Sequence, residues 1–145
     1  MRIGGKPRAA GNFPAELFEV AFIEPVLASA ADGVHLVGHS YGGAVALKAA
    51  LLHPARVRSL ALYEPTIFAL VDRDTPRPNG TEGIQQVVHE GADGLDRGDA
   101  EGAARAFIDF WMGTGSFDRT PPERRAPLVE GCRNVRRWAH ALLTG

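Results

Sequence analysis

The chain has 145 residues, of which 45% are apolar and 23% charged, a composition typical of one soluble folded domain and not of a disordered or fibrous polymer. Its formal charge of -1 provides no basic field for phosphates or anionic lipid, so we expect no nucleic-acid or membrane partner and favour a small-molecule substrate. The single cysteine, Cys132, excludes an internal disulfide and paired-cysteine metal sites and fits a reducing compartment, so we expect a cytoplasmic location. We also expect no metal and no cofactor.

The N-terminal segment predicts a loop followed by one helix. Residues 1–13 contain glycines without periodicity, which is typical of a loop or a frayed terminus. Apolar residues then recur near every 3.6 positions from about residue 14 to 31, which predicts a helix kinked at Pro25. Residues 17–27 of this stretch carry two carboxylates and this proline, so they lack the uninterrupted apolar run of a secretory signal.

The next segment predicts two strands joined by a helix. Residues 34–37 form a short apolar run of the kind that is buried on both faces of a parallel sheet. Ala44 to His53 is rich in alanine and leucine and ends before a proline, as helices commonly do, and residues 56–63 predict a second strand. Residues 14–70 therefore predict an α/β unit with parallel strands.

The C-terminal half predicts a different architecture. Residues 71–80 are rich in proline, glycine and charge and predict a linker, whereas residues 81–145 show helical periodicity throughout. Gly98 is expected to end the first of these helices, and Asp99 to cap the second. Thr120 is expected to start a third helix through a capping box with Glu123, with Pro121 in its first turn and a kink at Pro127.

One pentapeptide of the chain is a candidate catalytic motif. Gly38-His39-Ser40-Tyr41-Gly42 matches G-x-S-x-G between a predicted strand and a predicted helix, which is the context of a nucleophile elbow. The turn is sharp enough to strain the serine, so small residues are needed around it, and Gly38, Gly42 and Gly43 are expected to provide the clearance. The backbone N–H of Tyr41 would stabilise an oxyanion at the positive end of the following helix.

The alternative to a catalytic motif is a glycine-rich turn that binds phosphate and in which the serine has no catalytic role. The chain contains neither G-x-G-x-x-G nor the G-K-[ST] sequence that such sites need, which favours the nucleophile elbow.

Residues 34–44 and 53–60, which include this motif, together resemble the α/β-hydrolase superfamily around its fifth and sixth strands. The resemblance implies a partial α/β-hydrolase fold, in the order helix, strand, elbow, helix, strand, followed by a helical region similar to the family's cap or lid. It also implies a serine hydrolase that acts on an ester, thioester or similar activated carbonyl through an acyl-enzyme at Ser40. Dehalogenase and epoxide hydrolase chemistry are disfavoured, because they require a carboxylate at this position. Phe107, Phe110 and Trp111 of the cap-like region are more often helix core than a substrate wall.

The resemblance also implies a triad in the order serine, acid, histidine, with the histidine in a loop after the last strand. No strand is predicted after residue 81, so the sequence offers no such loop for the histidine. None of the five histidines, at positions 35, 39, 53, 89 and 140, is well placed as the general base. Glu64, at the end of the second predicted strand, is the one candidate for the acid, although a solvated strand end is the more common situation. We therefore expect a truncated family member that is inactive or very weak alone.

A second hypothesis comes from another class of protein. The chain would be a non-catalytic remnant or interaction module that keeps the elbow only as structure. It would associate with itself or a partner through a strand edge left open by missing neighbours.

Overall fold

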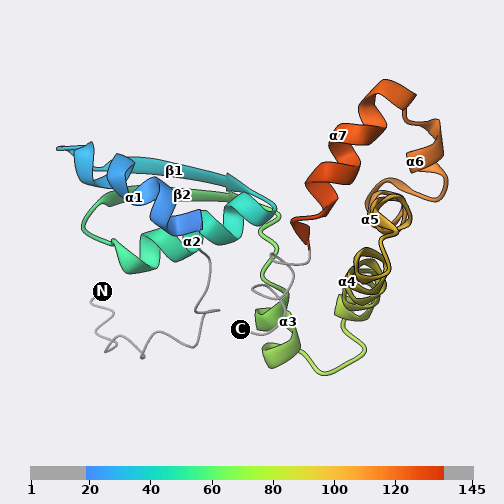
Figure 1. Cartoon of the computed structure of the whole chain (residues 1–145). Coiled ribbons are helices and arrows are strands. Elements are labelled where there is room, and N and C mark those ends of the chain that lie inside the picture. Colours follow the sequence, from blue (N-terminus) through green and yellow to red (C-terminus); the bar gives the residue numbers. More distant parts are fainter. Residues whose placement is uncertain (1–18, 136–145) are drawn as a thin grey trace. The chain divides into compact units, whose positions relative to one another are not determined.

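The computed structural model describes residues 19–135, which fall into two compact units that meet at the bond between Ile67 and Phe68 (Figure 1). The first unit contains two helices and two strands: α1 (Glu19–Ser29), β1 (Val34–His39), α2 (Tyr41–Leu52) and β2 (Val57–Tyr63). The second is helical and contains α3 (Phe68–Asp74), α4 (Thr81–Asp96), α5 (Ala100–Met112), α6 (Ser116–Arg119) and α7 (Pro122–Cys132). No helix among the described residues is long and apolar enough to cross a bilayer.

The first unit confirms the predicted strand-helix-strand order. β1 and β2 pair in parallel, with Leu36 opposite Leu60 and His39 opposite Tyr63. β1 runs two residues beyond its predicted end and α2 begins three residues before its predicted start. Ser40 alone separates them, because the glycines that follow it belong to the helix and not to a loop.

α2 covers one face of the two-stranded sheet. Its buried residues are all small, which allows the helix to lie close to the strands: Gly43, Ala44, Ala46 and Ala49. α1, which contains Pro25, packs against α2, and the buried residues of α1 are Val20 and Leu27. Two side-chain contacts join the helices, from the Tyr41 hydroxyl to Glu19 Oε2 at 2.7 Å and between His53 Nε2 and Glu24 Oε1 at 3.0 Å.

The opposite face of the sheet, which we call the open face, is exposed to solvent. Three cross-strand pairs form it: His35–Ser59, Val37–Ala61 and His39–Tyr63. Val37 is 82% exposed and Tyr63 64% exposed. The prediction that residues 34–37 are buried on both faces is therefore wrong, because α2 covers one face and no described element covers the other.

The expected linker at residues 71–80 differs in its first part, which is helical. α3 contains no buried residue and ends at Asp74, directly before Thr75 and Pro76. Asp72 in this helix accepts hydrogen bonds from side chains of the following loop and of α4: Arg77, Asn79, Thr81 and Gln85. The Arg77 guanidinium and these further donors hold the pKa of the Asp72 carboxyl well below its usual range. The proline-rich segment is thus fixed to the start of α4 by one carboxylate.

The helical unit confirms the first two predicted helices and their ends. α4 ends just before Gly98, which has a φ of 81° and donates its N–H to Leu95 O at 3.0 Å. Asp99 caps α5 by accepting a hydrogen bond from the Gly102 N–H at 2.8 Å.

The expected capping box at Thr120 is wrong. Pro121 is the N-cap of α7, and no side chain caps this helix end. Thr120 instead ends the short helix α6, and its hydroxyl donates to Ser116 O four residues earlier at 3.0 Å. The hydroxyl cannot serve both helices, and α6 was not predicted. Pro127 lies inside α7 as expected.

The core of the helical unit forms where α5, α6 and α7 meet. Its buried members are Ala104, Phe117 and Cys132, and four partly buried side chains pack against them: Phe107, Ile108, Val129 and Val135. Burial also raises the pKa of the Cys132 thiol. Phe107 is thus helix core, whereas Phe110 and Trp111 are 40% and 49% exposed, so the core assignment holds for one aromatic residue of the three.

Candidate active site

Ser40 occupies the turn between β1 and α2 with a backbone that few non-glycine residues adopt. Its φ is 53° and its ψ is -126°. Its N–H donates to Tyr63 O at 3.0 Å, which extends the strand pairing by one residue, and its carbonyl accepts from the Gly43 N–H at 2.9 Å, which starts the helix. The chain therefore changes from strand to helix within this one residue, and the strain is concentrated there.

Two glycines allow the strand and helix to approach each other behind Ser40. A Cβ atom on Gly38 would lie 2.5 Å from Gly42 O and 2.7 Å from Gly43 Cα. A Cβ atom on Gly43 would lie 2.9 Å from the Cβ of Pro65. These distances are shorter than real Cβ contacts, and most of the opposing atoms are backbone.

The prediction that Gly42 must lack a side chain to give the turn clearance is wrong. A Cβ atom there would meet nothing within 4 Å, so its side-chain position is open. Its carbonyl oxygen, however, is the atom that approaches Gly38 most closely. The turn therefore requires glycine at positions 38 and 43, whereas position 42 contributes backbone only.

Glu64 follows β2 just as Ser40 follows β1. Because His39 pairs with Tyr63, the two residues come directly after neighbouring positions at the carboxyl ends of parallel strands. Glu64 has a φ of 45°, and it and Ser40 are the non-glycine residues with positive φ in the described part of the chain. Strained residues of this kind cluster at functional sites. The Glu64 side chain is exposed.

The loop after Glu64 supports the elbow. The Thr66 N–H donates to Ser40 O at 3.2 Å, and Pro65 packs against Gly43. The Thr66 hydroxyl oxygen is buried and has no hydrogen-bond partner. Neither Pro65 nor Thr66 belongs to a sequence motif, because their role comes from contacts with residues more than twenty positions earlier.

Tyr41 is the first residue of α2, so its backbone N–H lies at the helix end where the dipole is positive. Its side chain points away from this role, since the hydroxyl donates to Glu19 of α1. The backbone N–H of Tyr41 thus lies at the elbow, whereas its side chain contacts α1.

The four described histidines each have a partner that accounts for their position. His35 Nδ1 lies 2.7 Å from Ser59 Oγ, and the His39 ring stacks on Tyr63 with ring centres 5.1 Å apart, both on the open face. His53 contacts Glu24 at the end of α2, and His89 lies 3.7 Å from Asp93 on α4. His140 lies outside the described residues. No cluster of metal-ligating side chains occurs in residues 19–135.

Comparison with known proteins gives one match. A family model described as "Alpha/beta hydrolase family" matches residues 4–144 of the 145-residue chain. No curated protein and no solved structure matches significantly. The family model covers nearly the whole sequence, and the parallel strands that alternate with helices agree with part of this fold. The chain therefore belongs to the alpha/beta hydrolase family.

Proposed function

We propose that the chain is a serine hydrolase that uses Ser40 as its nucleophile on an ester, thioester or similarly activated carbonyl. The observation that carries the proposal is the positive φ of Ser40 at the carboxyl end of β1, immediately before α2. A serine held in this way is expected at a nucleophile elbow and unfavourable in an ordinary turn.

The proposed reaction has two halves. In the first, Ser40 Oγ attacks the carbonyl carbon, the bond from that carbon to the leaving oxygen or sulfur breaks, and the hydroxyl proton passes to the leaving group. In the second, water attacks the resulting ester, Ser40 is released with its proton and the product is a carboxylic acid. The Tyr41 backbone N–H is the proposed donor to the oxyanion of both tetrahedral intermediates, aided by the α2 dipole.

The acid and the base set the expected rate. We propose Glu64 as the acid because its backbone is strained and it follows the strand beside Ser40. None of the four described histidines is a candidate for the base, because each is held by another partner. A serine without a positioned base keeps its proton at neutral pH, so we expect a rate on the order of 10⁶ below that of a complete triad.

A fluorophosphonate probe tests the nucleophile directly, because its phosphorus accepts the serine oxygen and releases fluoride. We expect slow covalent labelling of Ser40 by the purified chain, located by mass spectrometry of the peptides. Labelling should accelerate as the pH rises, because hydroxide can take the serine proton, for which none of the described histidines is placed. Ser40→Ala should abolish it.

Ser59→Ala is the matched control, since Ser59 is an exposed serine on the neighbouring strand with ordinary strand geometry. Labelling of this variant should equal that of the wild type. Absence of labelling in the wild type, or equal labelling of the Ser40→Ala variant, would contradict the proposed nucleophile.

The open face favours one second candidate, an interaction module that pairs with another copy of the chain. The face carries exposed Val37 and Tyr63, and none of its six residues is acidic, lysine or arginine. Two copies can therefore bring this face together without repulsion between like charges, in the self-complementary arrangement that two-fold dimers use. Each strand of the pair also has a free edge among the described residues, which can accept a further strand.

Replacing Val37 by lysine tests this association. Val37 is 82% exposed, so the variant should fold normally, but a two-fold dimer would place two positive charges near each other. We expect sedimentation velocity to show a concentration-dependent dimer for the wild type and a dissociation constant about tenfold or more higher for Val37→Lys. Leu51→Lys, at an exposed position of α2, is the control and should leave association unchanged. A wild type that is monomeric at all concentrations argues against the interaction module.

A further inference from the structure

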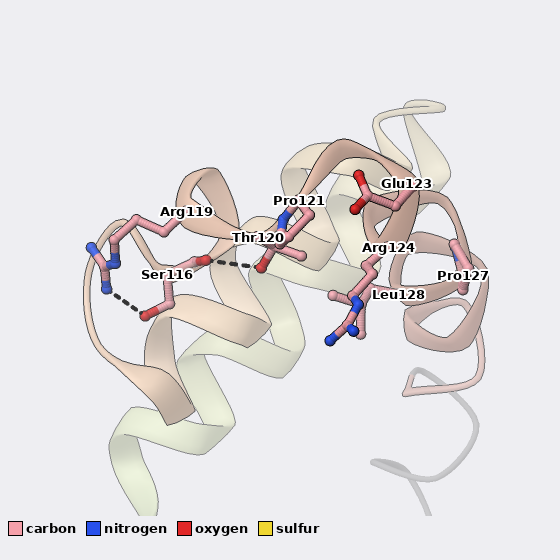
Figure 2. A pocket seen from close by; sticks show the side chains of 8 residues that line it. All are labelled: Ser116, Arg119, Thr120, Pro121, Glu123, Arg124, Pro127 and Leu128. Atoms are coloured by element: carbon pink, nitrogen blue, oxygen red, sulfur yellow. Dashed lines mark hydrogen bonds between the residues drawn. The ribbon is translucent and has the colours of Figure 1, made fainter.

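The helical unit contains a groove between α6 and the first turns of α7 (Figure 2). Its volume is about 650 Å³, which lies within the range of small-molecule sites. α6 contributes Ser116 and Arg119, and α7 with its preceding loop contributes Pro121, Arg124, Pro127 and Leu128. All residues that line the groove belong to the helical unit, whereas the elbow belongs to the first unit.

Neither arginine of the groove forms an ion pair with a residue that the structure describes. Arg119 donates to Thr114 O at 3.1 Å and to Ser116 Oγ at 2.7 Å, and both acceptors are neutral. Arg124 has no side-chain partner among the described residues, although Glu123 precedes it and also lines the groove. Four other arginines of this unit do pair with carboxylates: Arg73, Arg77, Arg105 and Arg133. The groove thus combines two unpaired guanidinium groups with one carboxylate.

The rest of the groove wall is apolar. Leu128, Pro121 and Pro127 provide hydrocarbon surface in the same groove that Arg124 lines (Figure 2). A guanidinium matches a carboxylate in a bidentate geometry, and hydrocarbon next to it favours an apolar body on the same ligand. Arg119 already donates to Thr114 O and Ser116 Oγ, whereas the Arg124 guanidinium has no hydrogen bond to any described residue and keeps its donors for a ligand.

We propose that this groove binds a small amphiphilic carboxylate, with its head group on Arg124 and its apolar chain along Leu128, Pro121 and Pro127. Arg119 adds positive charge at one side of the groove. The carboxylate is favoured over a neutral ligand by the excess of guanidinium groups, and over a bare anion by the apolar wall. This site is independent of Ser40 chemistry.

Octanoate is the probe, measured with the full chain by isothermal titration calorimetry. We expect binding to the wild type, binding at least about tenfold weaker to Arg124→Gln, and unchanged binding to Arg97→Gln. Arg97 is a matched control because it is an exposed arginine of the same unit, outside the groove and without a side-chain partner in residues 19–135. Acetate and octan-1-ol, which keep only the head group or only the chain, should each bind more weakly than octanoate.

Four results would overturn the proposal: no octanoate binding, equal binding to Arg124→Gln and the wild type, acetate binding as tight as octanoate, or octyl phosphate binding more tightly than octanoate. The last result would assign the groove to a phosphate ligand. Ser40→Ala should bind octanoate as the wild type does. Loss of octanoate binding in that variant would move the site to the elbow, so the two proposals fail separately.

Discussion

Gly38→Ala is expected to destabilise the first unit by about 3 kcal/mol and to remove the labelling of Ser40. The new Cβ would lie 2.5 Å from Gly42 O, 2.7 Å from Gly43 Cα and 2.9 Å from Ala46 Cβ. Because two of these atoms are backbone, α2 must move away from β1, which costs packing energy at the upper end of that for an overfilled core. The same shift displaces Ser40, whose carbonyl starts the helix. Urea unfolding followed by circular dichroism, with fluorophosphonate labelling of the same samples, measures both effects.

Gly42→Ala is the matched control for this prediction. Its Cβ meets nothing within 4 Å, and alanine favours a helix over glycine by up to about 1 kcal/mol. This variant should be as stable as the wild type or slightly more stable, and its labelling should persist. Equal destabilisation by both alanines would show that the close approach at Gly38 is not what fixes the elbow.

The elements of the first unit could be predicted because their signals are local. The apolar runs of β1 and β2, the alanine-rich α2 and the G-x-S-x-G pattern each lie within a few consecutive residues. Parallel pairing followed from the helix between the two strands. The helix ends at Gly98 and Asp99 were predictable for the same reason, since each signal acts within three residues.

Features that depend on competition between neighbouring segments were not predictable in this way. Thr120 is followed by the residues of a capping box, but its hydroxyl donates to the carbonyl of Ser116 in the preceding helix α6 and therefore does not cap α7. α3 forms within an apparent linker because the proline and glycine signals begin only after it ends. The exposure of Val37 also escaped prediction, since an apolar run cannot indicate which elements are present to cover it.

In the candidate site, too, residues with a local sequence signal were predictable and residues whose role depends on packing were not. Ser40 and Gly38 follow from the motif, whereas the strain at Glu64 and the contacts of Pro65 and Thr66 arise from residues brought together by strand pairing. Gly42 shows the limit of the motif itself, because the pattern treats both flanking glycines alike although the geometry requires a small side chain at only one of them. A pattern identifies where the turn is, and packing decides which of its residues are constrained.

Phe117→Ala is expected to cost the helical unit about 3–5 kcal/mol, which is the usual loss for a buried phenylalanine. Phe117 is fully buried and is the largest side chain with that degree of burial among the described residues. Two guanidinium carbons lie over its ring, that of Arg105 at 4.8 Å from the ring centre and that of Arg125 at 5.8 Å. Removing the ring leaves a cavity beside Ala104 and Cys132 and also removes the surface on which both cations lie. Tryptophan fluorescence during urea unfolding reports on this part of the chain, because both tryptophans, Trp111 and Trp138, follow residue 67.

Phe110→Ala provides the comparison, because Phe110 belongs to the same unit but is 40% exposed and lies outside this core. Its loss should cost about 1–2 kcal/mol, in proportion to the smaller area that it buries. The contrast matters because Phe117 stands alone in a polar segment, where nothing in the sequence distinguishes it from a surface residue. If the two alanine variants unfold at the same urea concentration, the junction of α5, α6 and α7 is not the core of this unit, and the groove formed by α6 and α7 lacks the rigid support that ligand binding requires.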